Sequence, residues 1–465
     1  MESCAIILAA GDGKRMKSAR PKVLCEVLLK PMLAWVLDGC RAAGIQNENL
    51  CVITSDRPEP LWPLLDGGVQ SAVQAERLGT GHAVRCAEGF LRKKRAEGVR
   101  EAAVLCGDAP FVGGELLAES LRAHRAGQNA VTVLTARVKD PGRYGRILRG
   151  ADGAFRCIRE AADASPDELL IDEINSGAYW FSIDYLLRAL PLLQNGNAQN
   201  EYYLTDTVEL APRLREKAGA FCCPDPAAAL GANDRRSLAE LNAAAREKVF
   251  GALYDAGVDI PVADGVMISP DASIGRDTLI LPGCILKGRV TVGEGCVIGP
   301  NTTLIDCEIG DRCTVDSSRI EKSRLGNGVR VGPFAQIRPG CEIAGSVKIG
   351  NFVELKNSTV GEKTSFAHLT YCGDSDFGAH VNVGCGVVTV NYDGNAKYRT
   401  VVGDGCFIGC NTNLVAPVRV GKGAYVAAAT TVTEDVPGDA LAIGRVRQQH
   451  KEGWAKAMRA KKPKP

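Results

Sequence analysis

The sequence predicts a Rossmann-like α/β domain followed by a solenoid of six-residue repeats, because the spacing of its apolar residues changes midway along the chain. Up to about residue 230, short apolar runs alternate with amphipathic stretches. These runs cover residues 4–9, 50–54, 102–105 and 130–134. Such alternation is typical of a layered α/β domain with a mainly parallel sheet. Ligands bind such sheets where strands end, so we expect the chemistry in the segments that follow the runs.

A helix is predicted between the two halves, because apolar residues there lie three or four positions apart. These residues are Leu238, Leu241, Ala245, Val249 and Leu253. We expect a first domain over residues 1–232, a linker helix over 233–256 and a second domain over 257–465. The alternative, in which this helix is the last one of the first domain, stays open.

The second domain carries the strongest pattern, an aliphatic residue at every sixth position. Three runs keep this period: Ile274, Ile280, Leu286, Val292, Ile298 and Leu304; Val331, Ile337, Ile343, Ile349 and Leu355; and Val402, Ile408, Leu414, Val420, Val426 and Val432. A helix has a period of 3.6 and a strand a period of 2, so neither explains the pattern, whereas a hexapeptide solenoid does. About nine coils of 18 residues fit between Ile274 and Pro437.

One polar segment, residues 391–400 (NYDGNAKYRT), breaks the six-residue register. Insertions leave a solenoid as loops, often on its binding face. We therefore expect this segment to be a loop that contacts a ligand.

The composition excludes several classes of partner. Lys and Arg (56) nearly balance Asp and Glu (54), so no large basic field is available for a nucleic-acid backbone or an anionic membrane. No run approaches the roughly 20 apolar residues of a membrane span, and the first residues lack a secretory core. We therefore expect a cytoplasmic protein whose partners are small molecules or copies of itself. The basic end, residues 451–465, is expected to be a solvated tail.

The 18 cysteines are scattered along the chain without any CxxC pair. In a long chain, this distribution favours reduced thiols over a disulfide framework.

The string LAAGDGKRM at residues 8–16, followed by Pro21 and Lys22, is the most specific motif of the first domain. Glycines after a strand let the backbone approach phosphates, and Arg15 and Lys22 supply positive charge. The string is not the dinucleotide fingerprint, which needs Gly where Met16 stands, and it is not the P-loop GxxxxGK[ST].

With further motifs, this string resembles the sugar-nucleotide pyrophosphorylases, and among them the family of bifunctional N-acetylglucosamine-1-phosphate uridyltransferases/glucosamine-1-phosphate N-acetyltransferases. The resemblance covers essentially the full chain. It implies a nucleotidyltransferase domain joined to a left-handed parallel β-helix of hexapeptide repeats that acts as an acetyltransferase. The motifs that carry it are Gln74 with GTGH at 79–82, GD at 107–108, YGR at 144–146, Glu160, EINSG at 173–177, EYYLTD at 201–206, NDR at 233–235, RPG at 338–340, NFVELK at 351–356, HLTY at 368–371, NYDG at 391–394 and KEGW at 451–454.

The resemblance implies a first site that joins UTP to N-acetylglucosamine 1-phosphate and releases pyrophosphate. Asp108, just after an apolar run, is the implied Mg²⁺ ligand with Asn233, since Mg²⁺ prefers hard oxygen ligands. Taken alone, Asp108 is equally compatible with a turn residue. The implied UTP and UDP-N-acetylglucosamine contacts are Leu8, Ala9, Gly11, Gly13, Arg15, Lys22, Gln74, Gly79, Thr80, Gly145, Glu160, Asn175 and Asn233.

The implied second site moves an acetyl group from acetyl-CoA to the amine of glucosamine 1-phosphate. An amine attacks only when unprotonated, so a general base is useful, and His368 matches the family's base. The implied sugar-phosphate contacts are Arg338, Lys356, Tyr371, Asn382, Asn391, Tyr392 and Lys397. The implied acetyl-CoA contacts are Cys410, Ala428 and Arg445. The resemblance also implies a homotrimer with acetyltransferase sites between neighbouring solenoids.

Four positions depart from the family pattern. Cys106 stands where Tyr is usual, Lys14 where Thr is common, Ala162 where Lys is frequent and Cys410 where Ser is common. These changes bear on sugar contacts, acetyl-CoA contacts and rate, and they leave the implied metal ligands in place.

Two alternatives stay open on the sequence. In one, the protein is a uridyltransferase or a related sugar-nucleotide pyrophosphorylase whose solenoid is only structural or regulatory. In the other, it is a non-catalytic binding protein that retains the fold. The presence of His368, Tyr371 and the 391–397 segment argues against a purely structural solenoid.

Overall fold

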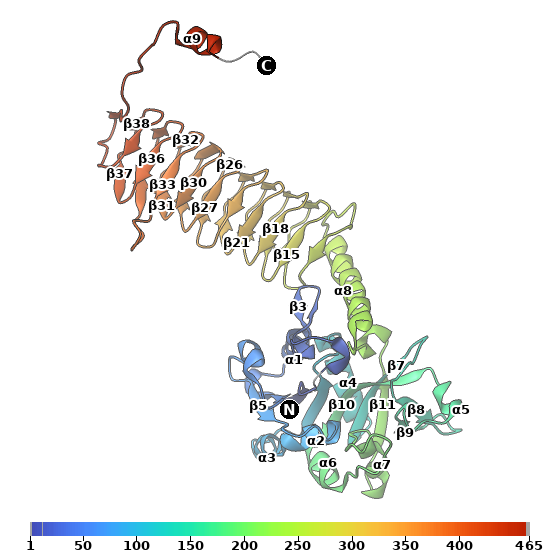
Figure 1. Ribbon diagram of the computed structural model, residues 1–465. Helices are drawn as coiled ribbons and strands as arrows, with labels where there is room; N and C mark the ends of the chain where they lie inside the picture. Colours follow the sequence, from blue (N-terminus) through green and yellow to red (C-terminus); the bar gives the residue numbers. More distant parts are fainter. Residues whose placement is uncertain (1, 12, 462–465) are drawn as a thin grey trace. The chain divides into compact units, whose positions relative to one another are not determined.

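The computed structural model describes residues 2–11 and 13–461 (Figure 1), and the chain divides into two compact units, Met1–Lys248 and Val249–Pro465. The first unit is built on a mixed sheet of nine strands. Its main path runs β11-β7-β10-β6-β1-β4-β5, with the hairpin β8–β9 attached to β10. The strands are β1 (Ser3–Leu8), β4 (Leu50–Thr54), β5 (Gln70–Val73), β6 (Glu101–Cys106), β7 (Val131–Arg137), β8 (Arg146–Arg149), β9 (Phe155–Arg159), β10 (Glu173–Ser182) and β11 (Ala218–Cys222).

On this path only β10 runs against its neighbours, so the expected mainly parallel sheet is confirmed. The four apolar runs of the sequence correspond to β1, β4, β6 and β7, within a few residues at each end.

Both faces of this sheet are buried. Alternate side chains of each strand point to opposite faces, so neighbouring residues belong to different cores. Ile6 and Val104 lie in one core cluster, whereas their neighbours Ile7 and Leu105 lie in the other. Helices cover both faces: α1 (Met32–Ala42), α2 (Thr80–Cys86), α3 (Glu88–Ala96), α4 (Gly114–Ala126), α6 (Ile183–Ala189) and α7 (Asp206–Arg213), with the short α5 (Pro166–Leu169) beside the hairpin.

The second unit is a parallel β-helix, as the six-residue period predicts. Its strands form three sheets of ten, nine and ten strands. These sheets run from β12 (Met267–Ile268) to β39 (Thr431–Val432), from β13 (Ser273–Ile274) to β37 (Val418–Val420), and from β14 (Leu279–Ile280) to β40 (Leu441–Ala442). Each strand pairs in parallel with the strand one coil further along, which satisfies the backbone amides without long strands.

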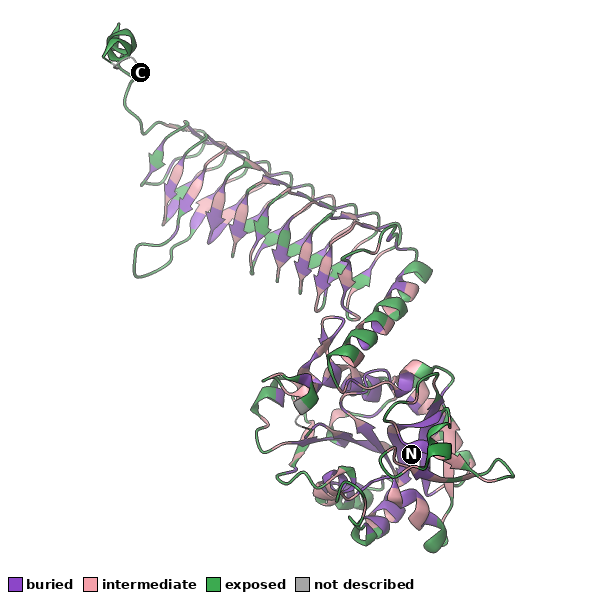
Figure 2. Ribbon diagram, turned by 45° about the vertical axis from the view of Figure 1, so that its right-hand side comes forward, coloured by how far each residue is buried: buried purple, intermediate pink, exposed green. Residues whose placement is uncertain are grey.

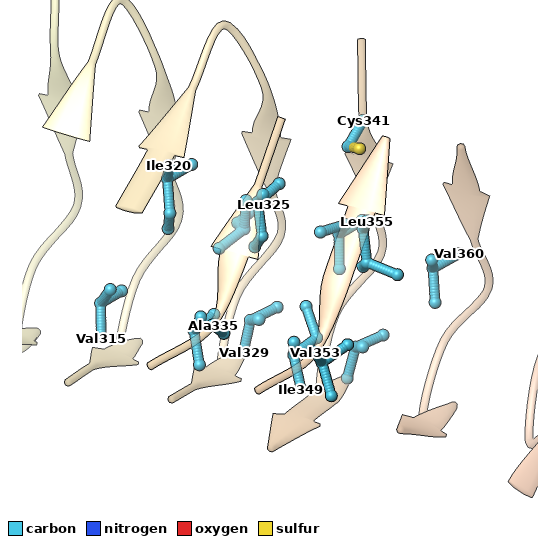
Figure 3. Close-up of a cluster of buried hydrophobic side chains, with 14 of the residues drawn as sticks. Val315, Ile320, Leu325, Val329, Ala335, Cys341, Ile349, Val353, Leu355 and Val360 are labelled. Atoms are coloured by element: carbon cyan, nitrogen blue, oxygen red, sulfur yellow. The ribbon is translucent and has the colours of Figure 1, made fainter. Parts of the chain in front are cut away.

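A single apolar core fills the inside of the coils. The aliphatic residues at the repeat positions point inward and stack on one another, as Figure 3 shows for Val315, Ile320, Leu325 and Leu355. In Figure 2 the buried positions recur along the strands of successive coils. Cysteines such as Cys284 and Cys341 are part of this core, and all 18 cysteines are free thiols.

The polar segment that breaks the register leaves the coil between β33 (Val388–Val390) and β34 (Thr400–Val402). Residues 392–399 are exposed, and Figure 2 shows the loop standing away from the stack. Asn391 and Thr400, at its two ends, are both buried. The loop is therefore anchored at both ends and exposed between them.

A helix, α8 (Arg235–Asp255), lies in the segment where the linker helix is expected, and the boundary between the two units falls within it. Leu241 and Ala245 are buried, and Phe250 and Leu253 belong to the solenoid core. After the last coil the chain is exposed, including α9 (Trp454–Ala460). Among the described residues, no helix has the length and apolar character needed to span a membrane.

We expect a fragment of residues 1–255 to fold without the solenoid, because the first unit has its own two core clusters. Circular dichroism and a cooperative thermal transition would check this. A fragment of residues 1–248, which lacks Phe250 and Leu253, is the matched comparison and should be less prone to association. Failure of both fragments to fold would show that the first domain depends on the solenoid.

Candidate active sites

The first candidate site lies at the carboxyl ends of β1 and β6, which are neighbours in the sheet. From β1 the chain continues to β4 and β5 on one side, whereas β6 lies on the other. This reversal is a topological switch point, where open α/β sheets bind their ligands. A pocket of about 350 Å³ opens there. Its lining is Leu8, Ala10, Gly11, Lys22, Val23, Gln74, Arg77, Gly79, Thr80, Ala83, Cys106, Asp108 and Glu201.

Seven of the predicted nucleotide and metal contacts line this pocket: Leu8, Gly11, Lys22, Gln74, Gly79, Thr80 and Asp108. Gln74 is buried, and its Nε2 donates to the carbonyl of Gly79 at 3.1 Å. Gly79 has a φ of 107°, and a Cβ there would lie 2.6 Å from the Tyr202 carbonyl, so the position requires glycine. Ala9 instead lines an adjoining pocket, which shares Ala10, Gly11 and Arg77 with the first.

Four charged or amide side chains converge at one edge of this pocket. Lys22 forms an ion pair with Asp108. Asn233 Oδ1 accepts hydrogen bonds from Lys22 Nζ at 3.3 Å and from Arg15 Nη2 at 3.1 Å. The amide of Ala232 donates to the Asp108 carbonyl at 3.1 Å, which holds Asn233 beside Asp108. A Cβ on Gly13 would lie 2.7 Å from Lys22 Cβ, so this glycine lets Lys22 approach.

The Asp108 and Asn233 oxygens fit the predicted Mg²⁺ site. The Lys22 ammonium interacts with both side chains: it forms an ion pair with the Asp108 carboxylate and donates a hydrogen bond to Asn233 Oδ1. Two hard oxygen ligands that already converge on a positive charge are what a partly hydrated Mg²⁺ requires.

The predicted sugar contacts form a group of their own. Gly145 O accepts from the Asn175 amide at 2.9 Å, and a Cβ on Gly145 would lie 3.4 Å from Glu160 Oε2. Asn175 Nδ2 donates to the Tyr179 hydroxyl at 2.7 Å. Burial raises the pKa of the Glu160 carboxyl. This group therefore combines a partly buried carboxyl with an ordered amide.

Cys106 connects the sugar group to the nucleotide pocket. It lines the pocket, and its Sγ donates to the carbonyl of Gly177 at 3.5 Å, two residues after Asn175. Burial raises the pKa of the Cys106 thiol to about 12, so it stays neutral. A neutral thiol thus stands where the family usually has the larger Tyr.

The second candidate site lies on the solenoid, around His368 at the end of β29 (Ser365–His368). His368 pairs in register with Asn351 at the end of β26 (Lys348–Asn351), and its Nδ1 hydrogen-bonds Asn351 Oδ1. Because an amide oxygen only accepts, Nδ1 carries a proton in this pairing, and in the neutral ring Nε2 is then the nitrogen with the free lone pair. His368 is exposed, so Nε2 is available to a substrate.

Three cationic side chains lie near one another beside β30 (Tyr371–Gly373). Arg338 follows β24 (Gln336–Ile337) and pairs with Glu354 at 2.9 Å. Lys356 ends β27 (Glu354–Lys356), and the nearby ammonium of Lys397 lowers the pKa of Lys356. Two ammonium groups that repel each other would be stabilised by an anion between them.

Gly373 makes room for two more predicted contacts. A Cβ there would lie 2.9 Å from Asn391 Nδ2 and would overlap the Tyr371 hydroxyl. The side chains of Tyr371 and Asn391 therefore both lie against Gly373. Gly373 pairs with Lys356 and lies one coil further along. Asn382, in β32 (Asn382–Val383), is exposed one coil beyond Ser365. Tyr392 lies in the exposed loop, where its hydroxyl donates to the Gly394 carbonyl at 2.5 Å.

The three predicted acetyl-CoA contacts lie along the same corner of the solenoid as His368. Backbone hydrogen bonds connect Leu369 to Gly386, Cys385 to Asn411 and Cys410 to Ala429 in successive coils. Cys410 and Ala428 are thus two and three coils beyond His368, or about 10 and 15 Å at the spacing of parallel strands. Arg445 Nη1 donates to the Ala428 carbonyl at 2.7 Å, which places it at the same corner.

The sequence analysis assigned no role to Asn351, Glu354 or Asp374, although each contacts a predicted site residue. Asn351 lies 17 residues before His368, and Asp374 lies 17 residues before Asn391. This separation is one coil, so a search for polar pairs one coil apart would have found both contacts.

Comparisons with known proteins agree with the division of the chain into two compact units. Residues 5–248 match the family of MobA-like NTP transferase domains. Residues 271–305 match the bacterial transferase hexapeptide family (six repeats), and residues 399–434 match the hexapeptide repeat of succinyl-transferase. The fold and the two sites thus define a nucleotidyltransferase joined to a hexapeptide-repeat transferase.

Close relatives match nearly the whole chain. "Bifunctional protein GlmU" of Exiguobacterium sp. (strain ATCC BAA-1283 / AT1b) is 45% identical over 456 residues, 98% of this chain and 100% of that protein. "Bifunctional protein GlmU" of Clostridium botulinum (strain 657 / Type Ba4) is 44% identical over 454 residues, 98% of each chain. That of Acetivibrio thermocellus (strain ATCC 27405) is 44% identical over 450 residues, 97% of this chain and 96% of that protein. The chain belongs to the family of bifunctional GlmU proteins.

Proposed function

We infer that this protein is a bifunctional enzyme that makes UDP-N-acetylglucosamine. It transfers acetyl from acetyl-CoA to glucosamine 1-phosphate, and it transfers the uridylyl group of UTP to the resulting N-acetylglucosamine 1-phosphate. The observation that carries this conclusion is the presence of two separate sites of different chemistry, a cation-lined pocket in the first unit and the His368 cluster on the solenoid. Family membership over nearly the full length supports the same conclusion.

Uridylyl transfer depends on position and charge neutralisation more than on covalent chemistry of the protein. The sugar phosphate oxygen attacks the α-phosphorus of UTP, and the bond to the pyrophosphate oxygen breaks. Arg15 and Lys22 lie where they can hold the phosphates, at the edge of the pocket with Asp108. Gln74, Gly79 and Thr80 line the pocket and are proposed to hold the uracil. Gly145, Glu160 and Asn175 are proposed to hold the amino sugar.

We propose that Asp108 and Asn233 hold Mg²⁺. When bound, the ion would neutralise phosphate charge and orient the phosphates. Lys22, which now pairs with both oxygens, would then be free to move toward the phosphates.

Acetyl transfer needs an unprotonated amine close to a thioester. Nε2 of His368 accepts a proton from the sugar amine as the nitrogen attacks the carbonyl carbon, the C–S bond breaks, and the thiolate of coenzyme A takes up a proton. Asn351 fixes the tautomer that leaves Nε2 free. Arg338, Lys356 and Lys397 supply the positive charge for the sugar phosphate, with Tyr371, Asn382, Asn391 and Tyr392 proposed as further contacts.

We also propose that the protein is a cytoplasmic homotrimer. On the single chain, Phe334 and Phe352 of adjacent coils stack at 5.4 Å between ring centroids while both remain exposed, and Leu369 continues this row. An exposed apolar row on a solenoid is suited to contact with another copy. The proposed substrates, UTP and acetyl-CoA, are cytoplasmic metabolites.

Two assays on the purified protein test the proposed function. We expect release of free thiol from acetyl-CoA that depends on glucosamine 1-phosphate, and release of pyrophosphate from UTP that depends on N-acetylglucosamine 1-phosphate and Mg²⁺. Pyrophosphate release alone would favour a uridyltransferase with a structural or regulatory solenoid. The absence of both reactions would favour a binding protein.

A further inference from the structure

Asp374 lies at the corner between β30 and β31 (Ser375–Phe377), and only 8% of it is exposed. Both of its carboxylate oxygens accept hydrogen bonds. Oδ1 accepts from Asn357 Nδ2 at 2.6 Å, and Oδ2 accepts from Asn391 Nδ2. These partners lie one coil before and one coil after Asp374, so one buried carboxylate joins three successive coils.

The backbone of Asp374 extends these connections. Its amide donates to the carbonyl of Lys356 at 2.9 Å, and its carbonyl accepts from the amide of Thr400 at 3.1 Å. Asn391 and Thr400 are the first and last residues of the exposed loop. Asp374 therefore holds both ends of the loop that carries Lys397, and it also contacts the strand that carries Lys356.

Lys356 and Lys397 influence the ionisation of the Asp374 carboxyl. Burial raises the pKa of its carboxyl, but the hydrogen bonds from Asn357 and Asn391 and the charges of Lys397 and Lys356 outweigh burial, so the pKa lies below its ordinary value. The carboxylate thus stays ionised at neutral pH and attracts both ammonium groups, which repel each other.

We propose that Asp374 is a positioning residue for acetyl transfer, which orders the 391–400 loop and holds Lys356 and Lys397 together to receive the phosphate of the sugar substrate. The inference rests on the proposed acetyltransferase function. Its physical basis is preorganisation: a loop ordered before binding does not lose its conformational freedom when the substrate arrives. Both carboxylate oxygens already accept amide hydrogens, which leaves the ammonium groups to the phosphate.

The test compares Asp374→Ala and Asp374→Asn with the wild-type full chain. Loss of hydrogen bonds to a charged group should raise the KM for glucosamine 1-phosphate about tenfold or more in Asp374→Ala. The KM for acetyl-CoA and the rate of uridylyl transfer should change less than about twofold. Asp374→Asn keeps the size of the side chain and removes its charge, so its KM should lie between those of the wild type and Asp374→Ala.

Limited trypsin digestion gives a second, independent measurement. Cleavage after Lys397 should be faster in both variants, and glucosamine 1-phosphate should protect the wild type at a lower concentration than the variants. The matched control is Glu308→Gln, another carboxylate-to-amide change in a contact between coils, where Glu308 pairs with Arg324 at 3.1 Å. This control should leave KM and cleavage unchanged.

The outcomes separate the two proposals. If the wild type shows no acetyl transfer, the proposed function fails, and the cleavage experiment still decides whether Asp374 orders the loop. If the wild type is active and a folded Asp374→Asn protein keeps both the wild-type KM and the wild-type cleavage rate, the positioning role is overturned. A fall in kcat with an unchanged KM would also overturn it. Should Asp374→Ala unfold, the Asn variant decides alone, with circular dichroism as the check on folding.

Discussion

Replacement of Asp108 by alanine is expected to reduce uridylyl transfer by at least about 10²–10³-fold, the scale of losing one preorganised electrostatic contact to a transition state. Asp108 is the only carboxylate among the described residues that the structure pairs with Lys22. Its loss removes a proposed Mg²⁺ ligand and leaves the Lys22 ammonium without its ion pair. Pyrophosphate release at saturating UTP and Mg²⁺ measures the effect.

Acetyl transfer by Asp108→Ala should remain near the wild-type rate, because Asp108 lies in the first unit and His368 in the second. Asp172→Ala is a suitable control, since Asp172 is also an ion-paired aspartate of the first unit, 3.2 Å from Arg137, but lies outside the nucleotide pocket. Uridylyl transfer by this control should be unchanged. Comparable loss of both activities in a folded Asp108→Ala protein would argue against two independent sites. Weaker binding of Mn²⁺, followed by electron paramagnetic resonance, would connect the loss to the metal.

The architecture could be predicted from the sequence because the apolar residues follow a recognisable pattern in each half. The runs that became β1 and β6 are continuous and apolar, as strands buried on both faces must be. The six-residue period of the solenoid reports directly which side chains point inward. Between Leu304 and Val331, however, the period fails. There Thr314 pairs with Arg330, only 16 residues further on, where a regular coil has 18.

The coil continues through this segment because a corner can lose a residue while the inward positions stay in register. Val315 and Ile320 are five residues apart, yet both are buried in the same core. A strict search for a six-residue repeat therefore misses coils that the structure contains. The physical constraint is the inward side chain of each face, not the number of residues between faces.

Site residues were predictable to different degrees. The resemblance to a known family proposed His368 and Asn233, but it gave no reason for their positions. That reason lies in contacts between distant segments, such as the hydrogen bond from the Ala232 amide to the Asp108 carbonyl. Asp374 was not proposed, because its importance depends on neighbours one coil away on either side. Such contacts become visible only when the coil register is known.

Replacement of His368 by alanine is expected to remove most acetyl transfer and to spare uridylyl transfer. General-base catalysis contributes typically about 10²–10⁴ in rate, so a loss in that range is expected while the substrate still binds. The hydrogen bond from Nδ1 to Asn351 Oδ1 makes Nε2 the nitrogen of the neutral ring that can accept a proton, and His368 is exposed. Release of coenzyme A thiol at saturating substrates measures the effect.

A matched control is His380→Asn. His380 is also an exposed histidine on a solenoid corner, and its φ of 57° is a conformation that asparagine adopts readily. This variant should retain acetyl transfer. Circular dichroism and sedimentation should show that His368→Ala keeps its fold and oligomeric state, since a disrupted solenoid would also lose activity.

The pH dependence distinguishes a missing base from a missing contact. As pH rises, more of the substrate amine is already unprotonated, so the absence of His368 matters less and the rate of His368→Ala should approach that of the wild type. A contact that only binds the sugar would leave the ratio of the two rates constant with pH. If a folded His368→Ala protein transfers acetyl at the wild-type rate at neutral pH, His368 is not the base. The hydroxyl of Tyr371, the next predicted site residue along the chain, would then be the side chain to test.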